Sequence, residues 1–384
     1  MNFLQLFKKA FERVIRDSGV FDVPVSAQKA FLDGLPAPKD DIQRSYLQYR
    51  CQARLMKRGL PFLLNCAAMP LLPLYSLKLR RHSGSSSEPE QQDDAVLIFA
   101  GPQSIVPDSL RREFQITQVK DFQQHQQLDC KDIAYLRELR KRYPFAFYFR
   151  FKCMMKVAMY SYVISHHGPR AVICSEEYSF TSSLLTDYCR QRHVAHINIM
   201  HGEKLFDITD SFFHFDRFFV WDHFYIDLFC DLRAENSQFV TEIPPSLCFS
   251  GQDSQLESVD YTYYLGNESP AQIDAILKSL SVLRDRGARV ALRPHPIYHD
   301  HSYFLFEDTH GFLIERAAEI SIEDSLLRTG CAVSLYSTVL LQAACNGIPF
   351  VIDDVSDPEK YRQLGELRFI CLNKEHRLLS ELLK

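Results

Sequence analysis

Several common site motifs are missing from this 384-residue sequence. Its 11 cysteines form no C-x-x-C pair and show no zinc spacing, so we expect neither a disulfide scaffold nor a structural zinc. The patterns G-x-x-x-x-G-K-S/T and G-x-G-x-x-G are also missing, which disfavours P-loop and dinucleotide chemistry. No internal repeat of fixed period is present.

The composition is that of an ordinary globular protein, with 46% hydrophobic and 24% charged residues. The length suits two domains of about 150 residues each plus an extension. Several cysteines lie in apolar segments, where a thiol packs as a small hydrophobe, so we expect a reduced, cytoplasmic protein.

The net charge of −4 is distributed unevenly. Residues 1–81 contain 14 Lys and Arg against six Asp and Glu, which gives this segment a net charge of +8 and the rest an acidic balance. Apolar residues recur there at helical spacing against Lys8, Lys9, Arg13 and Arg16, as in an amphipathic helix. We therefore expect a basic, mostly helical extension that binds an anionic membrane surface. The acidic remainder gives no support for nucleic-acid binding.

The segment Leu60–Leu79 is largely apolar and has basic residues on both sides. It contains Pro61, Pro70, Pro73 and Asn65, which argue against a straight membrane-spanning helix. We expect a docked or interfacial hairpin in preference to a span.

Beyond residue 94 the sequence alternates short apolar strands with helical segments, which predicts parallel sheets covered by helices. Residues 82–94 are polar and are expected to form a linker; residues 95–240 and 241–384 are expected to form two Rossmann-like domains with a cleft between them. The expected strands are Ala95–Ala100, Ala171–Ser175, Ala195–Met200, Arg217–Trp221, Tyr261–Leu265, Arg289–Leu292, Gly311–Glu315, Cys331–Leu335 and Pro349–Asp353.

Polar side chains gather after two of these strands, Arg289–Leu292 and Cys331–Leu335, where a helix follows from Val339. A helix N-terminus favours anions, and open α/β sheets bind ligands at the carboxyl ends of their strands. We predict a nucleotide or nucleotide-sugar phosphate site there. Its residues are Arg293, His295, Pro296, Ser334, Ser337 and Thr338. A rigid turn and an ordinary helix cap are the alternative for these residues.

Two segments in the first half offer a proton acceptor. Glu176 and Glu177 directly follow one predicted strand, and His201-Gly202-Glu203 follows the next. A carboxylate can be tuned towards neutral pH by partial burial, whereas a histidine titrates near neutral pH without tuning. The catalytic base is therefore sought among Glu176, Glu177, His201 and Glu203. Asp353, Asp354 and Asp357 are interpreted as a solvated loop, and we expect no metal site.

The His295-Pro296 pair and the later Ser337-Thr338 pair resemble motifs of bacterial GT-B glycosyltransferases, most specifically sialyltransferases and related capsule and lipopolysaccharide transferases that use CMP-sugars. In those families the two motifs hold the nucleotide phosphate. Their acidic base motif ends in glycine, whereas this chain has Glu176-Glu177-Tyr178. The His201-Gly202 pair is similar to one in CDP-glycerol-type polymerases of teichoic acid synthesis.

The resemblance implies a GT-B fold, with 95–240 on the acceptor side and 241–384 binding the nucleotide sugar. It implies an inverting, metal-independent transferase without a cofactor, peripheral on the inner face of the cytoplasmic membrane. The expected donor is CMP-linked sialic acid or Kdo, and the expected acceptor is a bacterial surface glycan, free or lipid-linked. Alternatives are a UDP-sugar or CDP-glycerol donor, a nucleotide-sugar epimerase of the same fold, and a non-catalytic nucleotide-binding partner.

Overall fold

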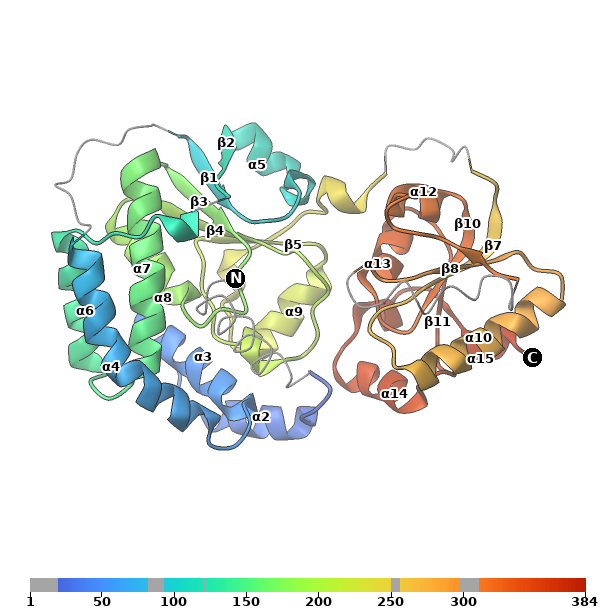
Figure 1. Ribbon diagram of the computed structural model, residues 1–384, viewed down its shortest axis with the longest axis horizontal. Helices are drawn as coiled ribbons and strands as arrows, with labels where there is room; N and C mark the ends of the chain where they lie inside the picture. Colours follow the sequence, from blue (N-terminus) through green and yellow to red (C-terminus); the bar gives the residue numbers. More distant parts are fainter. Residues whose placement is uncertain (1–19, 82–92, 121, 250–255, 297–310) are drawn as a thin grey trace. The chain divides into compact units, whose positions relative to one another are not determined.

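The computed structural model describes residues 20–81, 93–120, 122–249, 256–296 and 311–384. The chain divides into two compact units, the first made of Met1–His201 and Phe206–Pro244, and the second of Gly202–Leu205 and Pro245–Lys384. Each unit contains one six-stranded sheet (Figure 1). The basic residues of the predicted amphipathic helix, Lys8 to Arg16, lie outside the described residues.

The first sheet has the strand order β2-β1-β3-β4-β5-β6, and all its described pairs are parallel. Its strands are β1 (Ala95–Ile98), β2 (Ile116–Gln118), β3 (Ala171–Cys174), β4 (Ala195–Ile199), β5 (Arg217–Val220) and β6 (Phe239–Thr241). β1 and β3 are buried at every position, because helices cover both faces of a parallel sheet.

Successive strand residues enter different hydrophobic clusters on the two faces of this sheet. Val96 and Val172 pack with the long helix α7 (Phe147–His167) and with α8 (Ser182–Gln191). Leu97 and Ile173 pack on the other side with Leu110 of α5 (Asp108–Glu113). The remaining helices among the described residues of the unit are α2 (Val25–Asp33), α3 (Asp41–Leu55), α4 (Leu60–Arg81), α6 (Cys130–Arg142) and α9 (His223–Asp231).

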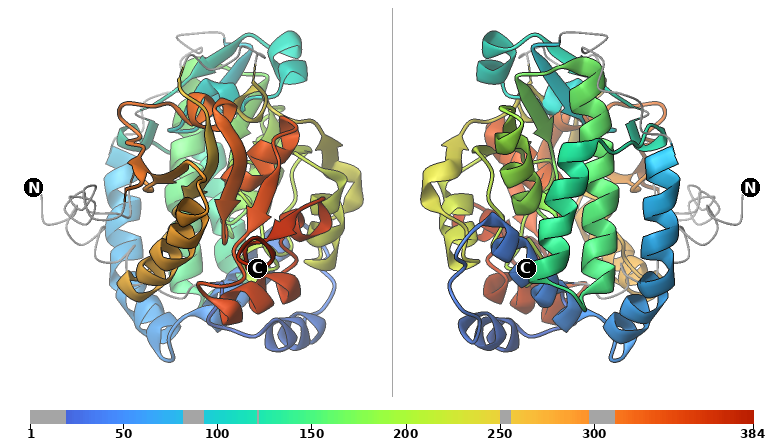
Figure 2. Two further views of the ribbon diagram at one scale, coloured as in Figure 1. Left: turned by 90° about the vertical axis from the view of Figure 1, so that its right-hand side faces the viewer. Right: turned by 90° about the vertical axis from the view of Figure 1, so that its left-hand side faces the viewer.

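The segment expected to form a hairpin is one continuous helix, α4, so that expectation is wrong. Pro70 and Pro73 lie inside it, and the helix persists because one side packs on α7 through the buried Leu64 and Ala68. Asn65 also joins the two helices: its amide donates to the carbonyl of Phe145 and accepts from the amide N–H of Tyr148, each at 3.1 Å. Figure 2 shows α4, α6 and α7 side by side.

The second sheet has the strand order β12-β11-β10-β7-β8-β9, again with every described pair parallel. Numbered within the unit, this is the Rossmann order 6-5-4-1-2-3. Its strands are β7 (Val259–Tyr264), β8 (Val290–Arg293), β9 (Leu313–Ile314), β10 (Thr329–Ser334), β11 (Phe350–Ile352) and β12 (Arg377–Leu378).

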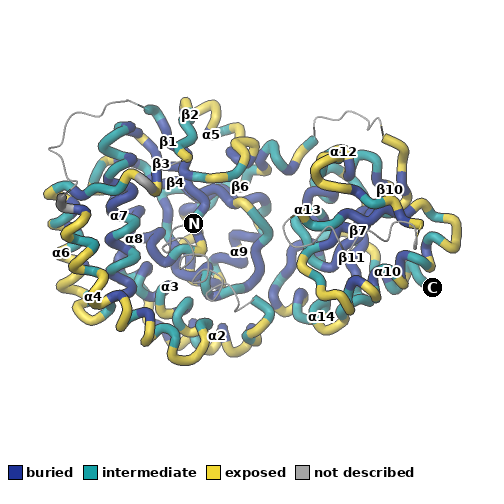
Figure 3. The backbone as a smooth tube through the Cα atoms, in the orientation of Figure 1, coloured by how far each residue is buried: buried dark blue, intermediate teal, exposed yellow. Residues whose placement is uncertain are grey.

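Helices cover this second sheet as well. The helix α10 (Pro270–Asp285) begins with a capping box formed by Ser269 and Gln272 and packs on the sheet through Ile276 and Leu280. The other helices are α12 (Ile322–Leu327), α13 (Thr338–Cys345), α14 (Pro358–Glu366) and α15 (Leu379–Leu382). In Figure 3 the inner strands of both sheets are mostly buried, whereas much of α4 is exposed. The predicted α/β class with two Rossmann-like units is confirmed.

Candidate functional site

The first unit brings three strand ends together at one edge of its sheet. The chain order reverses between β1 and β3, and open α/β sheets bind ligands at such a reversal. Phe99 follows β1, the run from Ser175 to Tyr178 follows β3, and His201 lies just beyond β4. The ring centroid of His201 is 6.0 Å from that of Phe99 and 6.2 Å from that of Tyr178. A polar and aromatic group therefore occupies the ligand-binding edge.

The hydrogen bonds around His201 assign its ring proton. The Ser175 hydroxyl donates its one proton to the carbonyl of Ile199, over an Oγ–O distance of 2.7 Å. Its oxygen lies 2.5 Å from His201 Nδ1 and must therefore accept a hydrogen bond from Nδ1–H. Glu177 Oε1, at 3.7 Å from Nδ1, favours the same arrangement. The basic lone pair of the neutral ring is then on Nε2, as a general base requires.

Glu177 lies behind His201 and is fully buried. Its Oε2 accepts a hydrogen bond from the side-chain amide of Asn198 at 2.9 Å. A base must come within hydrogen-bond reach of the proton that it removes, and a carboxylate with 0% exposure does not reach a sugar hydroxyl. The structure therefore corrects the prediction that Glu177 is itself the base, and gives it the position of a group that orients His201.

Glu176 forms an ion pair with Lys156 of α7. Its backbone N–H donates to Asn198 Oδ1 at 2.8 Å, so the same asparagine joins both glutamates. The Glu176 carboxylate is therefore already engaged by a charged partner. Glu176 thus fits the role of base less well than His201.

Helix α3 holds the loop that carries these residues. Gln48 is fully buried, and its amide donates to the carbonyl of Glu177 at 2.8 Å; that of Gln52 donates to the carbonyl of Tyr178 at 2.6 Å. The described part of the basic N-terminal segment is therefore built into the site of the first unit. The sequence gives no signal for this, because the two glutamines lie more than 120 residues before the loop.

Glu203 belongs to the second unit, whereas His201 belongs to the first. The chain passes into the second unit at Gly202, and Glu203 lies there near Cys371, where its negative charge adds to the effect of burial in raising the pKa of that thiol.

In the second unit the chain order reverses between β7 and β10, which places the expected ligand crevice at the ends of these strands. Gly266 follows β7, and a β-carbon there would lie 3.3 Å from Glu268 Oε1 and 3.5 Å from the carbonyl of Tyr336 beyond β10. The backbones beyond the two strands therefore approach closely at this edge. The helix α13 begins there at Thr338.

Ser337 is the N-cap of α13, and its hydroxyl accepts from the amide N–H of Val339 at 3.2 Å. Thr338 is the first helical residue and is partly exposed at this edge. Ser334, in contrast, is fully buried and donates to the carbonyl of Tyr264 at 2.8 Å. Ser334 joins two strands, so it does not serve as the ligand contact that we predicted.

Arg293 is directed into the interior of the second unit. Its side chain pairs with Glu315, at 3.3 Å, and donates to the carbonyl of Ile320 at 2.8 Å. Glu315 is fully buried and also pairs with Arg328. A guanidinium engaged in this buried network does not face a phosphate, so the structure corrects the predicted role of Arg293. Removing it would leave a buried carboxylate with one cation fewer.

His295 and Pro296 follow β8, on the opposite side of β7 from β10. His295 is half-buried, and burial lowers its pKa, so the neutral imidazole is favoured near pH 7. A neutral imidazole can donate one hydrogen bond to a phosphate oxygen. The loop residues 297–310, which follow directly, lie outside the described residues.

The sequence reasoning missed Glu268, two residues beyond Gly266. Burial raises the pKa of this carboxyl group, whereas the backbone N–H groups of Glu268 and Gly266, which donate to it, and the charge of Lys360 act in the opposite direction. Perturbed carboxyl groups at ligand-binding edges are candidates for function. Its only sequence signal is its place just after a predicted strand.

The aspartates after β11 are not a solvated loop. Asp353 is fully buried and accepts from the Tyr263 hydroxyl at 2.7 Å and from the amide N–H groups of Val355 and Ser356. Asp357 is the N-cap of α14. Among the described residues, no group of three or more His, Cys, Asp or Glu side chains is arranged to hold a metal ion.

No protein family matches this chain, and no curated protein matches it in sequence. Solved structures are similar to it at low identity. A variant of the wall teichoic acid polymerase TagF has 9% identity and a TM-score of 0.44, with 88% of this chain and 87% of that chain covered. A putative UDP-N-acetylglucosamine 2-epimerase from Listeria monocytogenes has 10% identity and a TM-score of 0.44, with 71% and 82% covered.

The UDP-GlcNAc 2-epimerase of Methanocaldococcus jannaschii, solved with UDP-GlcNAc and UDP, also has 10% identity and a TM-score of 0.44, with 73% of this chain and 92% of that chain covered. Identities and TM-scores this low do not assign an activity to the chain. Its function must be argued from its own residues.

Proposed function

We propose that this chain is an inverting, metal-independent glycosyltransferase that moves a sugar from a nucleotide-activated donor to a hydroxyl acceptor. Inversion by direct displacement needs a base that removes the acceptor proton while the nucleotide phosphate leaves. His201 is that base, and Glu177 and Ser175 are the residues that orient its ring.

The observation that carries the proposal is the hydrogen-bond chain at His201 Nδ1. The Ser175 hydroxyl donates a hydrogen bond to the Ile199 carbonyl and accepts one from Nδ1–H of His201, so the basic lone pair is on Nε2. Glu177 then stabilises the imidazolium that forms when Nε2 takes a second proton. Buried polar groups that orient one partly exposed histidine are typical of acid–base catalysis.

The second unit is proposed to bind the nucleotide phosphate. Ser337 and Thr338 begin α13 at the reversal of strand order, and helix N-termini favour negative charge. His295 adds a neutral donor at the same edge. We propose CMP-linked sialic acid or Kdo as the donor, because the His-Pro and Ser-Thr pairs resemble those of CMP-sugar transferases, and we propose that no cofactor is needed.

We also propose that the protein binds the cytoplasmic face of a membrane through α4. By length and composition α4 is the one helix among the described residues that could cross a membrane, with 11% of its apolar window buried. Its packing on α7 favours lying in the interface over spanning it. The outward side is largely apolar, with these large exposed side chains: Phe62, Leu63, Met69, Leu71, Leu74 and Leu77. The exposed Lys57 and Arg58 precede the helix and suit anionic headgroups.

The proposal is tested by incubating the full chain with CMP-, UDP- and CDP-activated donors, with and without bacterial glycan acceptors. Nucleotide release that depends on the acceptor, together with a glycosylated product, supports a transferase. Isomerised sugar without any acceptor would make the chain an epimerase instead. Binding of a nucleotide without any turnover of the donors would leave only a nucleotide-binding protein.

A further inference from the structure

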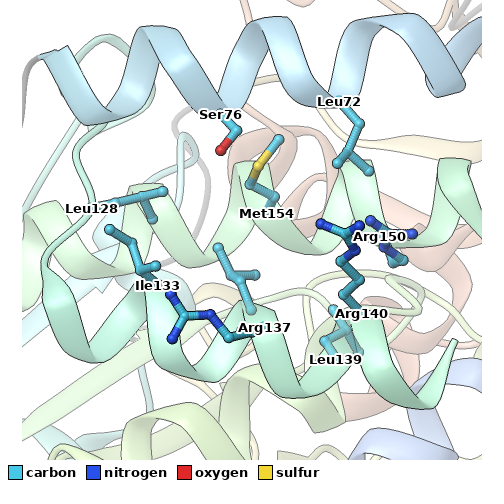
Figure 4. A pocket seen from close by; sticks show the side chains of 10 residues that line it. Leu72, Ser76, Leu128, Ile133, Arg137, Leu139, Arg140, Arg150 and Met154 are labelled. Atoms are coloured by element: carbon cyan, nitrogen blue, oxygen red, sulfur yellow. The ribbon is translucent and has the colours of Figure 1, made fainter. Parts of the chain in front are cut away.

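The strongest unassigned feature of the first unit is a pocket of about 140 Å³ between α4, α6 and α7 (Figure 4). Its apolar wall includes Leu72 of α4 and Met154 of α7. Three arginines also line it: Arg137 and Arg140 from α6, and Arg150 from α7. In Figure 4 the side chains of Arg140 and Arg150 lie side by side near Leu72.

Among the described residues, no carboxylate balances the positive charge of this pocket. None of the residues that line it is acidic, and within the described parts of the chain no carboxylate forms an ion pair with the three arginines. Other arginines of this unit do have such partners, as Arg192 has in Asp129 and Arg170 in Asp94.

Arg150 is the most informative of the three, because it is only 8% exposed. Its guanidinium donates to the carbonyl of Pro144 at 2.6 Å, which is a neutral partner. Burial and the neighbouring charge of Arg140 both lower the pKa of Arg150. A buried cation is costly unless an anion accompanies it, and guanidinium groups match the oxygens of phosphate.

The surroundings of the pocket indicate what such an anion is attached to. Leu72 and Ser76 face the pocket from α4, while Leu71, Leu74 and Leu77 of the same turns are exposed on the helix surface. A ligand that fills the pocket with a charged group thus has an exposed apolar helix directly beside it.

We propose that this arginine pocket binds the phosphate of an anionic phospholipid, whose acyl chains lie along the exposed side of α4. The inference rests on the proposed membrane association and deepens it: the contact is a specific site for one lipid headgroup as well as a general attraction of charges.

The test uses the full chain and vesicles of phosphatidylcholine, with or without phosphatidylglycerol, in a co-sedimentation assay. The variant Arg140→Gln/Arg150→Gln removes two pocket charges. The matched control, Lys131→Gln/Lys141→Gln, removes two charges from exposed positions of α6 outside the pocket. We expect the control to lose less than about tenfold in vesicle affinity and the pocket variant to lose about tenfold more than the control. Equal losses would overturn the proposal.

A second variant tests the site even if the arginine variant fails to fold. Ser76→Phe keeps every charge and fills the pocket, and it should weaken binding to phosphatidylglycerol vesicles while leaving the melting temperature within a few degrees. Unchanged binding of Ser76→Phe would also overturn the site.

The source of the phosphate is separated by adding glycerol 1-phosphate and a short-chain phosphatidylglycerol to the protein in thermal-shift assays. A shift with the lipid that is lost in Arg140→Gln supports the proposal. An equal shift with glycerol 1-phosphate would make the ligand a free phosphate and overturn the lipid assignment.

These outcomes are distinct from failure of the proposed function. Membrane association fails if the parent protein binds no vesicles, whereas the pocket inference fails if the parent binds and the pocket variants bind equally well. Acceptor-dependent release of nucleotide in detergent tests the transferase by itself, and we expect the pocket variants to retain it.

Discussion

Substitution of Glu177 by Gln removes a charge 3.7 Å from His201 Nδ1 while keeping the shape of the side chain. At that distance, and with an effective dielectric constant of about 20, a carboxylate and an imidazolium attract by about 4 kcal/mol. The His201 side chain is 34% exposed, so water screens part of this attraction. We take about half of this attraction, near 2 kcal/mol, as the stabilisation of the protonated His201 ring that Glu177→Gln removes. This corresponds to about a 30-fold loss in kcat.

The loss should appear in kcat and not in KM, because Glu177 is fully buried and touches no substrate. The assay is nucleotide release from the active donor, measured for Glu177→Gln alone and combined with His201→Asn. A control is Glu242→Gln, which changes another hydrogen-bonded carboxylate of the same unit and should leave kcat within about threefold. If Glu177→Gln lowered kcat equally with and without His201, Glu177 would not act through that histidine, and the reasoning would be refuted.

Three further predictions concern other parts of the molecule. Thr338→Val should weaken nucleotide binding by about 1 kcal/mol, the value of a neutral hydrogen bond; unchanged affinity in calorimetry would reduce Thr338 to a helix residue. Burial lowers the pKa of His196 from 6.5 to about 3, so its contribution to stability is full above about pH 6.5 and is lost as the pH falls towards 3. Urea unfolding should show about 2 kcal/mol less stability from this group at pH 5 than at pH 7, and a pH dependence that is equally steep in His196→Asn would contradict this. Leu71→Gln/Leu74→Gln should reduce vesicle binding at least tenfold without loss of stability, because both side chains are exposed; binding equal to the parent would exclude the outer side of α4 as the membrane contact.

The sequence predicts the strands that carry the sites well, since their apolar runs are short, continuous and bounded by turns. It predicts the edge strands β2, β6 and β12 poorly, because they have two or three residues each and little hydrophobic pattern. The sequence wrongly predicts a hairpin for α4, because its prolines are local helix breakers. The helix is stabilised by packing on α7, which is a contact between segments far apart in sequence.

The candidate site shows the same difference between local and distant information. His201 and Thr338 are predicted from their places after strands, and in the structure they follow β4 and β10, respectively. Arg293 has an equally suitable place, but its partner Glu315 is 22 residues further along the chain, and no local pattern reveals that pairing. The support of the 177–178 loop by Gln48 is likewise invisible in the sequence.

Substitution of His201 by Asn tests whether this imidazole removes the acceptor proton while the nucleotide stays bound. Nucleotide release from the active donor and nucleotide-induced thermal shift are measured on the same preparation. We predict that turnover falls by about 10²-fold to 10⁴-fold, as expected for loss of a general base, while the thermal shift stays as in the parent. Turnover within a few-fold of the parent in a folded His201→Asn protein would contradict the account.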